Sequence, residues 1–137
     1  MRASVTFSGT MPLRGSDPNG CVTLFDTSPE YHGTGSASSP VVVLLESLAS
    51  CSIIDIIAIL NKKRRQIDSL IASVEAERAE THPRVFTSIS IHYELTSPDC
   101  PREDFEKAVG LSMDKYCSVA AILRNSGCKI SWTANLT

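Results

Sequence analysis

The most apolar part of the chain is residues 41–60, in which hydrophobic side chains occupy nearly every position. Ser39 and Pro40 come directly before it, and a capping hydroxyl followed by a first-turn proline is typical of a helix start. We therefore predict a helix over residues 40–63. Because this sequence is apolar on almost every face, the helix should be covered on most sides, in a core or at an interface.

A thiol and a carboxylate lie within this apolar segment. Cys51 and Asp55 are four residues apart, so they share one face of the predicted helix. A buried free cysteine usually packs like a small hydrophobe, but a buried carboxylate needs a partner or an altered pKa. The other positions predicted on this face are Leu44, Ser47, Leu48 and Ala58.

Elsewhere the pattern alternates with a period of two residues, which predicts strands. The first two strands, at about 3–8 and 21–25, should form a hairpin, because Gly9–Gly20 between them is rich in turn-forming residues. Arg14 would lie in this hairpin loop, and residues 26–39 are expected to form an ordered loop. Further strands are predicted over about 67–79, 85–96 and 128–134.

Two shorter helices are predicted in the C-terminal half. One begins at Pro101 and ends near Met113, and the other covers Ser118–Arg124. Cys117 falls between them, where the backbone N–H groups of the second helix would stabilise a thiolate and lower its pKa. Since strands and helices occupy separate blocks, the expected class is α+β, in a single domain over residues 1–137.

Composition indicates an ordinary soluble globular protein. The 137 residues are 42% hydrophobic and 20% charged, and the net charge of -2 gives no sign of a nucleic-acid surface. Glu46 and Asp55 would each cost about 2.5–3.5 kcal/mol near the centre of a bilayer, so the apolar segment is not expected to span a membrane. No secretory signal is recognised, and the expected compartment is the cytoplasm.

Five cysteines supply the remaining candidate chemistry. They lie at positions 21, 51, 100, 117 and 128 without a CxxC pair, and the three histidines are scattered. Neither a metal site nor a cofactor is therefore predicted. From spacing alone, packing and chemistry both stay open for Cys51 and Cys117. Activation of Cys51 in the middle of a helix would need a cation, supplied by Arg14 or by a partner chain.

Three stretches of the chain are more specific. They are Ser39–Lys63 with Cys51 near its centre, Glu75–Phe86, and Lys115–Val119 around Cys117. In this order they resemble the OsmC/organic hydroperoxide resistance family, closest to its OsmC-like branch. The similarity extends over roughly residues 3–136.

The resemblance implies antiparallel sheets with a long buried central helix, in an intertwined homodimer with each active site at the subunit interface. It also implies a cofactor-free, thiol-dependent peroxidase that reduces organic hydroperoxides or hydrogen peroxide. Cys51 would be the peroxidatic cysteine, oxidised to a sulfenic acid, and Cys117 the resolving cysteine that forms a disulfide with it. An external dithiol would reduce that disulfide.

Further residues are implicated in activating Cys51. The family arginine follows the first strand, and Arg14 matches that location. In the organic hydroperoxide resistance branch a glutamate after the proline holds this arginine, whereas Val41 stands here. Asp55, on the Cys51 face, and Glu46, about 140° away around the helix, are then candidates for positioning.

A second function stays open on the same scaffold. The protein could act as a redox sensor or bind a small apolar ligand, with little turnover. In either case the expected partners are a second copy of the chain and a small molecule, with neither nucleic acid nor membrane.

Overall fold

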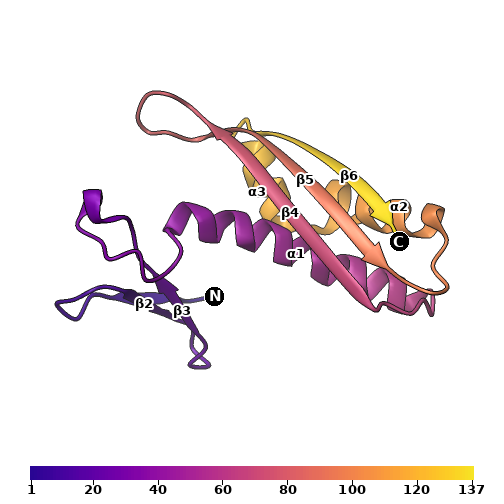
Figure 1. Cartoon of the computed structure of the whole chain (residues 1–137), viewed down its shortest axis with the longest axis horizontal. Coiled ribbons are helices and arrows are strands. Elements are labelled where there is room, and N and C mark those ends of the chain that lie inside the picture. The colour runs from indigo at the N-terminus through magenta and orange to yellow at the C-terminus, as the bar shows by residue number, and fades with distance from the viewer. The chain divides into compact units, whose positions relative to one another are not determined.

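The computed structural model describes residues 1–137. The chain forms two compact units, Met1–Leu45 and Glu46–Thr137. Its class is α+β, as predicted, with two three-stranded sheets and three α-helices (Figure 1). The single domain expected over the whole chain stays a prediction.

The first unit contains an antiparallel sheet in the order β1-β2-β3. Its strands are β1 (Ser4–Thr6), β2 (Leu13–Ser16) and β3 (Val22–Phe25). The predicted hairpin is therefore wrong, because β2 lies between the other two strands and Arg14 belongs to β2 rather than to a loop. Gly15 explains the error, since a Cβ there would lie 2.8 Å from the ring of Phe25. This glycine makes room for packing, although glycine in a sequence usually indicates a turn.

The loop after β3 is ordered, as predicted, and Asp26 holds it. The carboxylate is buried and accepts hydrogen bonds from the Ser36 and Thr34 hydroxyls, both at 2.6 Å. It also accepts backbone N–H groups of Thr27, Thr34 and Ser36 at 2.7–3.0 Å. The hydrogen bonds from the Ser36 and Thr34 side chains hold the pKa of Asp26 well below its usual range. One carboxylate thus organises the loop that leads to the long helix.

We predict that Asp26→Asn lowers the melting temperature at pH 7 by about 5 °C or more. The NH₂ group of the asparagine side chain cannot accept hydrogen bonds, so backbone N–H and hydroxyl donors around position 26 are left without an acceptor. Because the folded pKa of Asp26 is depressed, its contribution is complete above the unfolded pKa of about 4 and declines as the pH falls below that value. Thermal melts at several pH values should therefore show the two proteins converging in acid. The exposed Asp68, replaced in the same way, is the control; an equal loss for both would contradict the prediction.

The second unit is built on the sheet β4-β5-β6. Strand β4 is antiparallel to β5, while β6 runs parallel to it. Side chains alternate between the two faces: in β5, Ile91 and Tyr93 are buried, while Ser90 and His92 are exposed. The predicted strands are confirmed as β4 (Ser69–Arg78), β5 (Phe86–Thr96) and β6 (Lys129–Leu136).

Helices cover one face of this sheet, with α2 and α3 against β6 (Figure 1). A π-helical turn, Ser112–Tyr116, continues α2 and leads to Cys117. The helices are α1 (Pro40–Lys62), α2 (Arg102–Leu111) and α3 (Ser118–Asn125), with a short 3₁₀ turn at Pro29–Tyr31. All three predicted α-helices are confirmed, and the Ser39 hydroxyl lies 3.4 Å from the backbone N of Val42 at the start of α1.

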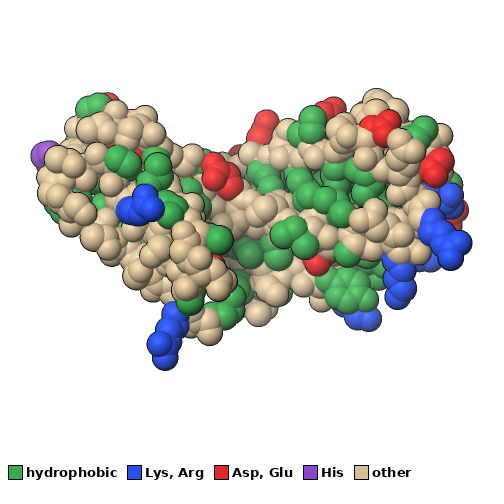
Figure 2. All heavy atoms as spheres, turned by 90° about the horizontal axis from the view of Figure 1, so that it is seen from below, with side chains coloured by type: hydrophobic (Ala, Val, Ile, Leu, Met, Phe, Trp, Pro, Cys, Tyr) green, Lys and Arg blue, Asp and Glu red, His purple; other side chains and the backbone are tan.

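Helix α1 buries only one stripe. Its buried side chains recur every four residues at Leu48, Ser52, Ile56 and Leu60. The single chain does not cover it on most sides, since Ile54 is 67% exposed and Ile57 36%, and its covering at an interface stays a prediction. Hydrophobic side chains gather on this side of the second unit, as Figure 2 shows. By length and composition alone, α1 could also cross a membrane.

Candidate thiol site

Two thiols and a carboxylate meet in the second unit. The Sγ atoms of Cys51 and Cys117 and a carboxylate oxygen of Asp55 all lie within 4.8 Å of one another. Cys51 and Asp55 come from adjacent turns of α1, and Cys117 from the junction between the π-helical turn and α3. The fold therefore joins the two cysteines that the sequence singled out, together with the neighbouring carboxylate.

The two thiols differ in exposure. Cys51 is half-buried, so a small molecule can reach it, whereas Cys117 is only 3% exposed. Cys117 is the N-cap of α3, and its Sγ accepts the backbone N–H of Ala120 at 3.4 Å. The site thus pairs an accessible thiol with a protected one.

The pKa of Cys117 is raised to about 11. Burial is the largest cause, and the neighbouring Cys51 and Asp55 add to it, while the N–H of Ala120 acts in the opposite direction. The prediction that the helix N-terminus lowers this pKa is therefore wrong, because desolvation outweighs one long hydrogen bond. Cys117 is a neutral thiol at pH 7.

Asp55 is held by a hydroxyl from the π-helical turn. Ser112 Oγ lies 2.9 Å from Asp55 Oδ2 and 3.3 Å from the carbonyl oxygen of Ser52. Ser112 is fully buried, while Asp55 is half-buried. Within the second unit no lysine or arginine forms an ion pair with Asp55. The carboxylate is thus fixed in direction by a neutral donor.

A buried polar network supports the site from the sheet. Tyr93 donates its hydroxyl proton to Ser52 Oγ at 2.7 Å, and Ser52 in turn donates to the carbonyl oxygen of Ala49 at 2.8 Å. The Tyr93 oxygen also lies 3.3 Å from Met113 Sδ. Burial raises the pKa of Tyr93 to about 12, and the two nearby thiols contribute. These bonds fix α1 against β5 one residue from Cys51.

Sequence reasoning missed Ser52, Ser112 and Tyr93 as parts of the site. A signal for each was present: the serines interrupt apolar helix faces, and the alternation of β5 directs Tyr93 inward. Because a hydroxyl on an apolar face is usually satisfied within its own helix, these signals do not identify a site without the fold.

A hollow of about 260 Å³ adjoins the cluster. It is lined by Asp55, Ala58, Ile59, Lys62 and Tyr116. Its wall is mostly apolar, and its charged residues are Asp55 and Lys62. A small organic molecule with a polar end fits this surface better than a multiply charged one does.

Arg14 and Glu46 were also predicted to act at the site. Arg14 is exposed on β2 of the first unit, beside Leu24 of β3 and Thr6 of β1. Glu46 is exposed on α1. Their roles in activating Cys51 stay predictions. Of the remaining cysteines, Cys21 is exposed, while Cys100 and Cys128 are buried, and burial raises the pKa of both buried thiols.

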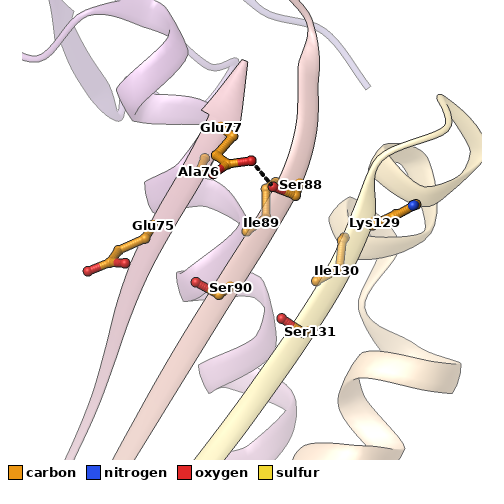
Figure 3. A pocket seen from close by; sticks show the side chains of 9 residues that line it. All are labelled: Glu75, Ala76, Glu77, Ser88, Ile89, Ser90, Lys129, Ile130 and Ser131. Atoms are coloured by element: carbon orange, nitrogen blue, oxygen red, sulfur yellow. Dashed lines mark hydrogen bonds between the residues drawn. The ribbon is translucent and has the colours of Figure 1, made fainter. Parts of the chain in front are cut away.

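Another hollow, of about 350 Å³, lies along the sheet strands (Figure 3). Polar side chains such as Glu77, Ser88 and Lys129 line it, and Ser88 donates to Glu77 at 3.1 Å. No thiol borders it, and its charges are open to solvent. It therefore offers no thiol and no enclosed donor set.

Residues 33–133 match the model of the OsmC-like protein family. The chain belongs to this family, as the resemblance in its sequence indicated.

The chain is also similar to individual proteins. The chain is 32% identical to Protein YhfA of Escherichia coli (strain K12) over 126 residues, covering 92% of this chain and 91% of that protein. A hypothetical protein from Aquifex aeolicus VF5 has the same fold, with a TM-score of 0.80, 28% identity and coverage of 99% and 96%. An organic hydroperoxide resistance protein OsmC from Legionella pneumophila has a TM-score of 0.71 at 14% identity, covering 98% and 95%.

Proposed function

We propose that this protein is a cytoplasmic, thiol-dependent peroxidase that reduces organic hydroperoxides or hydrogen peroxide. The observation that carries the proposal is the pairing of an accessible thiol, Cys51, with a buried one, Cys117, within 4.8 Å. Membership of the OsmC-like family and the fold of the Legionella hydroperoxide resistance protein support it.

The chemistry follows from the difference in exposure. The Cys51 sulfur attacks one peroxide oxygen, so that ROOH and the thiol become ROH and a Cys51 sulfenic acid. The Cys117 thiol then attacks this sulfenic sulfur, which gives a disulfide and one water. An external dithiol restores both thiols by exchange and is itself oxidised to a disulfide. The apolar hollow beside Asp55 would hold the organic part of the peroxide.

We further propose that the working form is a homodimer. Ile54 and Ile57 on α1 are exposed in the single chain, as are Val5 and Phe7 of the first unit. Surfaces of this kind usually mark an interface. A second copy would cover α1 and bring a partner arginine, equivalent to Arg14, within reach of Cys51.

The proposal is tested by oxidising the reduced protein with one equivalent of cumene hydroperoxide. We expect one equivalent of alcohol per subunit, and a single disulfide between Cys51 and Cys117 in peptide mapping. Repeated turnover with dithiothreitol should follow. A disulfide that involves Cys100 or Cys128, or no alcohol at all, would contradict the proposal. Stoichiometric oxidation without turnover under several dithiols would instead favour a redox sensor.

A further inference from the structure

The donor set of the thiol site fits a metal ion as well as a peroxide. We propose that the reduced protein binds one thiophilic divalent cation, such as Zn²⁺, through Cys51, Asp55 and Cys117. These residues come from two distant parts of the chain, so no ligand spacing appears in the sequence. The proposal concerns the reduced site alone and does not depend on peroxide turnover.

The distances suit a metal with little rearrangement. The three candidate ligand atoms lie within 4.8 Å of one another. A tetrahedral zinc ion with Zn–S bonds of about 2.3 Å holds two sulfurs roughly 3.8 Å apart. Closing the site around zinc therefore requires at most about 1 Å, whereas a disulfide requires the sulfurs to approach to about 2.05 Å. The reduced arrangement is thus closer to a metal-bridged pair than to a disulfide.

Charge also favours a cation at this position. Two thiols and a carboxylate share a partly buried space, and no basic side chain of the second unit forms an ion pair with the carboxylate. Zn²⁺ replaces the two thiol protons, so binding yields a bis-thiolate carboxylate complex and two protons in solution. Two neutral thiols and a carboxylate carry one net negative charge, and the complex of Zn²⁺ with two thiolates and a carboxylate carries the same charge, so binding adds no charge to the partly buried space.

A hydrogen bond already orients the carboxylate that would bind the metal. Ser112 donates to Asp55 Oδ2 at 2.9 Å, which fixes the direction of the group and leaves Oδ1 outside that bond. Hydrogen bonds of this kind orient metal ligands and contribute to affinity. Asp55 also lines the hollow beside Ala58 and Ile59, from which a water molecule or a small thiol would complete the coordination.

Metal and peroxide would then compete for the same sulfur atoms. A bound zinc ion holds both thiols as ligands, so it blocks attack on a peroxide until a chelator removes it. The cluster would thereby be protected from oxidation whenever the metal is present.

The test is an anaerobic titration of reduced, tag-free protein with Co²⁺, a spectroscopic substitute for Zn²⁺. We expect one equivalent to produce a thiolate-to-cobalt charge-transfer band and the visible d–d bands of a tetrahedral site. One equivalent of Zn²⁺ should abolish both. Asp55→Asn and Ser112→Ala should each weaken Co²⁺ binding about 10–100-fold. Cys51→Ser or Cys117→Ser should remove the charge-transfer band or reduce it to that of a single thiolate.

Cys100→Ser and Cys128→Ser are matched controls, since each removes a buried thiol of the same unit. Both should bind Co²⁺ as the parent protein does. The proposal is overturned if the parent shows no charge-transfer band, if Asp55→Asn binds with unchanged affinity, or if the control variants lose binding as strongly as the cluster variants. Because no peroxide is added, failure here leaves peroxidase activity to be judged separately.

Discussion

Cys51→Ser is expected to lower the rate of peroxide consumption by about 100-fold or more. A serine hydroxyl cannot attack the O–O bond at neutral pH, and the other thiol of the site, Cys117, is only 3% exposed. Stopped-flow or coupled assays with cumene hydroperoxide measure the effect. The substitution replaces one half-buried atom, so the melting temperature should change little, and a preserved rate would remove Cys51 from the mechanism.

Cys117→Ser separates the two proposed steps. It should leave the first turnover intact, because Cys51 still reaches the peroxide, but no disulfide can form afterwards. The Cys51 sulfenic acid should then be trapped by dimedone and oxidise further with excess peroxide. Cys128→Ser, which also removes a buried thiol, should turn over normally and serves as the control.

Ile54→Lys is expected to weaken self-association about 100-fold or more. The side chain is 67% exposed in the single chain, and a second copy of α1 or another apolar surface would bury the new ammonium without a partner. That penalty amounts to several kcal/mol, and each 1.4 kcal/mol is a tenfold change in the dissociation constant. Analytical ultracentrifugation over a range of concentrations should show a monomer where the parent is a dimer.

Ile71→Lys is the matched control for this prediction. Ile71 is 53% exposed and lies on the exposed face of the sheet, opposite Glu94 in the register. This variant should keep the oligomeric state of the parent. A monomeric parent, or equal effects of both lysines, would contradict an interface along α1.

The sequence predicted most of the fold because its local signals agree with the tertiary structure. Ser39 and Pro40 begin α1 where expected, and the alternation in β5 identifies the buried positions. Strand β2 was missed because Gly15 serves close packing against Phe25. A single sequence does not distinguish that use of glycine from a turn.

Local sequence patterns predicted less of the thiol site than of the fold. The four-residue spacing of Cys51 and Asp55 was visible in the sequence, but only the family resemblance linked them to Cys117. The error in the pKa of Cys117 has the same origin: a helix N-terminus is a local feature, whereas burial depends on the whole fold. Ser112 lies within the helix predicted from Pro101 to Met113, yet its bond to Asp55 depends on how this segment meets α1.

The π-helical turn at Ser112–Tyr116 has a consequence for how this segment can vary between relatives. Such a turn accommodates one residue more than an α-helix does over the same length. Deleting one of its residues would let the turn relax to an α-helix while the segments on either side keep nearly the same phase, so Cys117 should stay beside Cys51. Inserting a further residue would instead rotate Cys117 and α3 by about 100° and separate the two thiols. Relatives that keep both thiols should therefore tolerate the loss of one residue in this segment better than the gain of one.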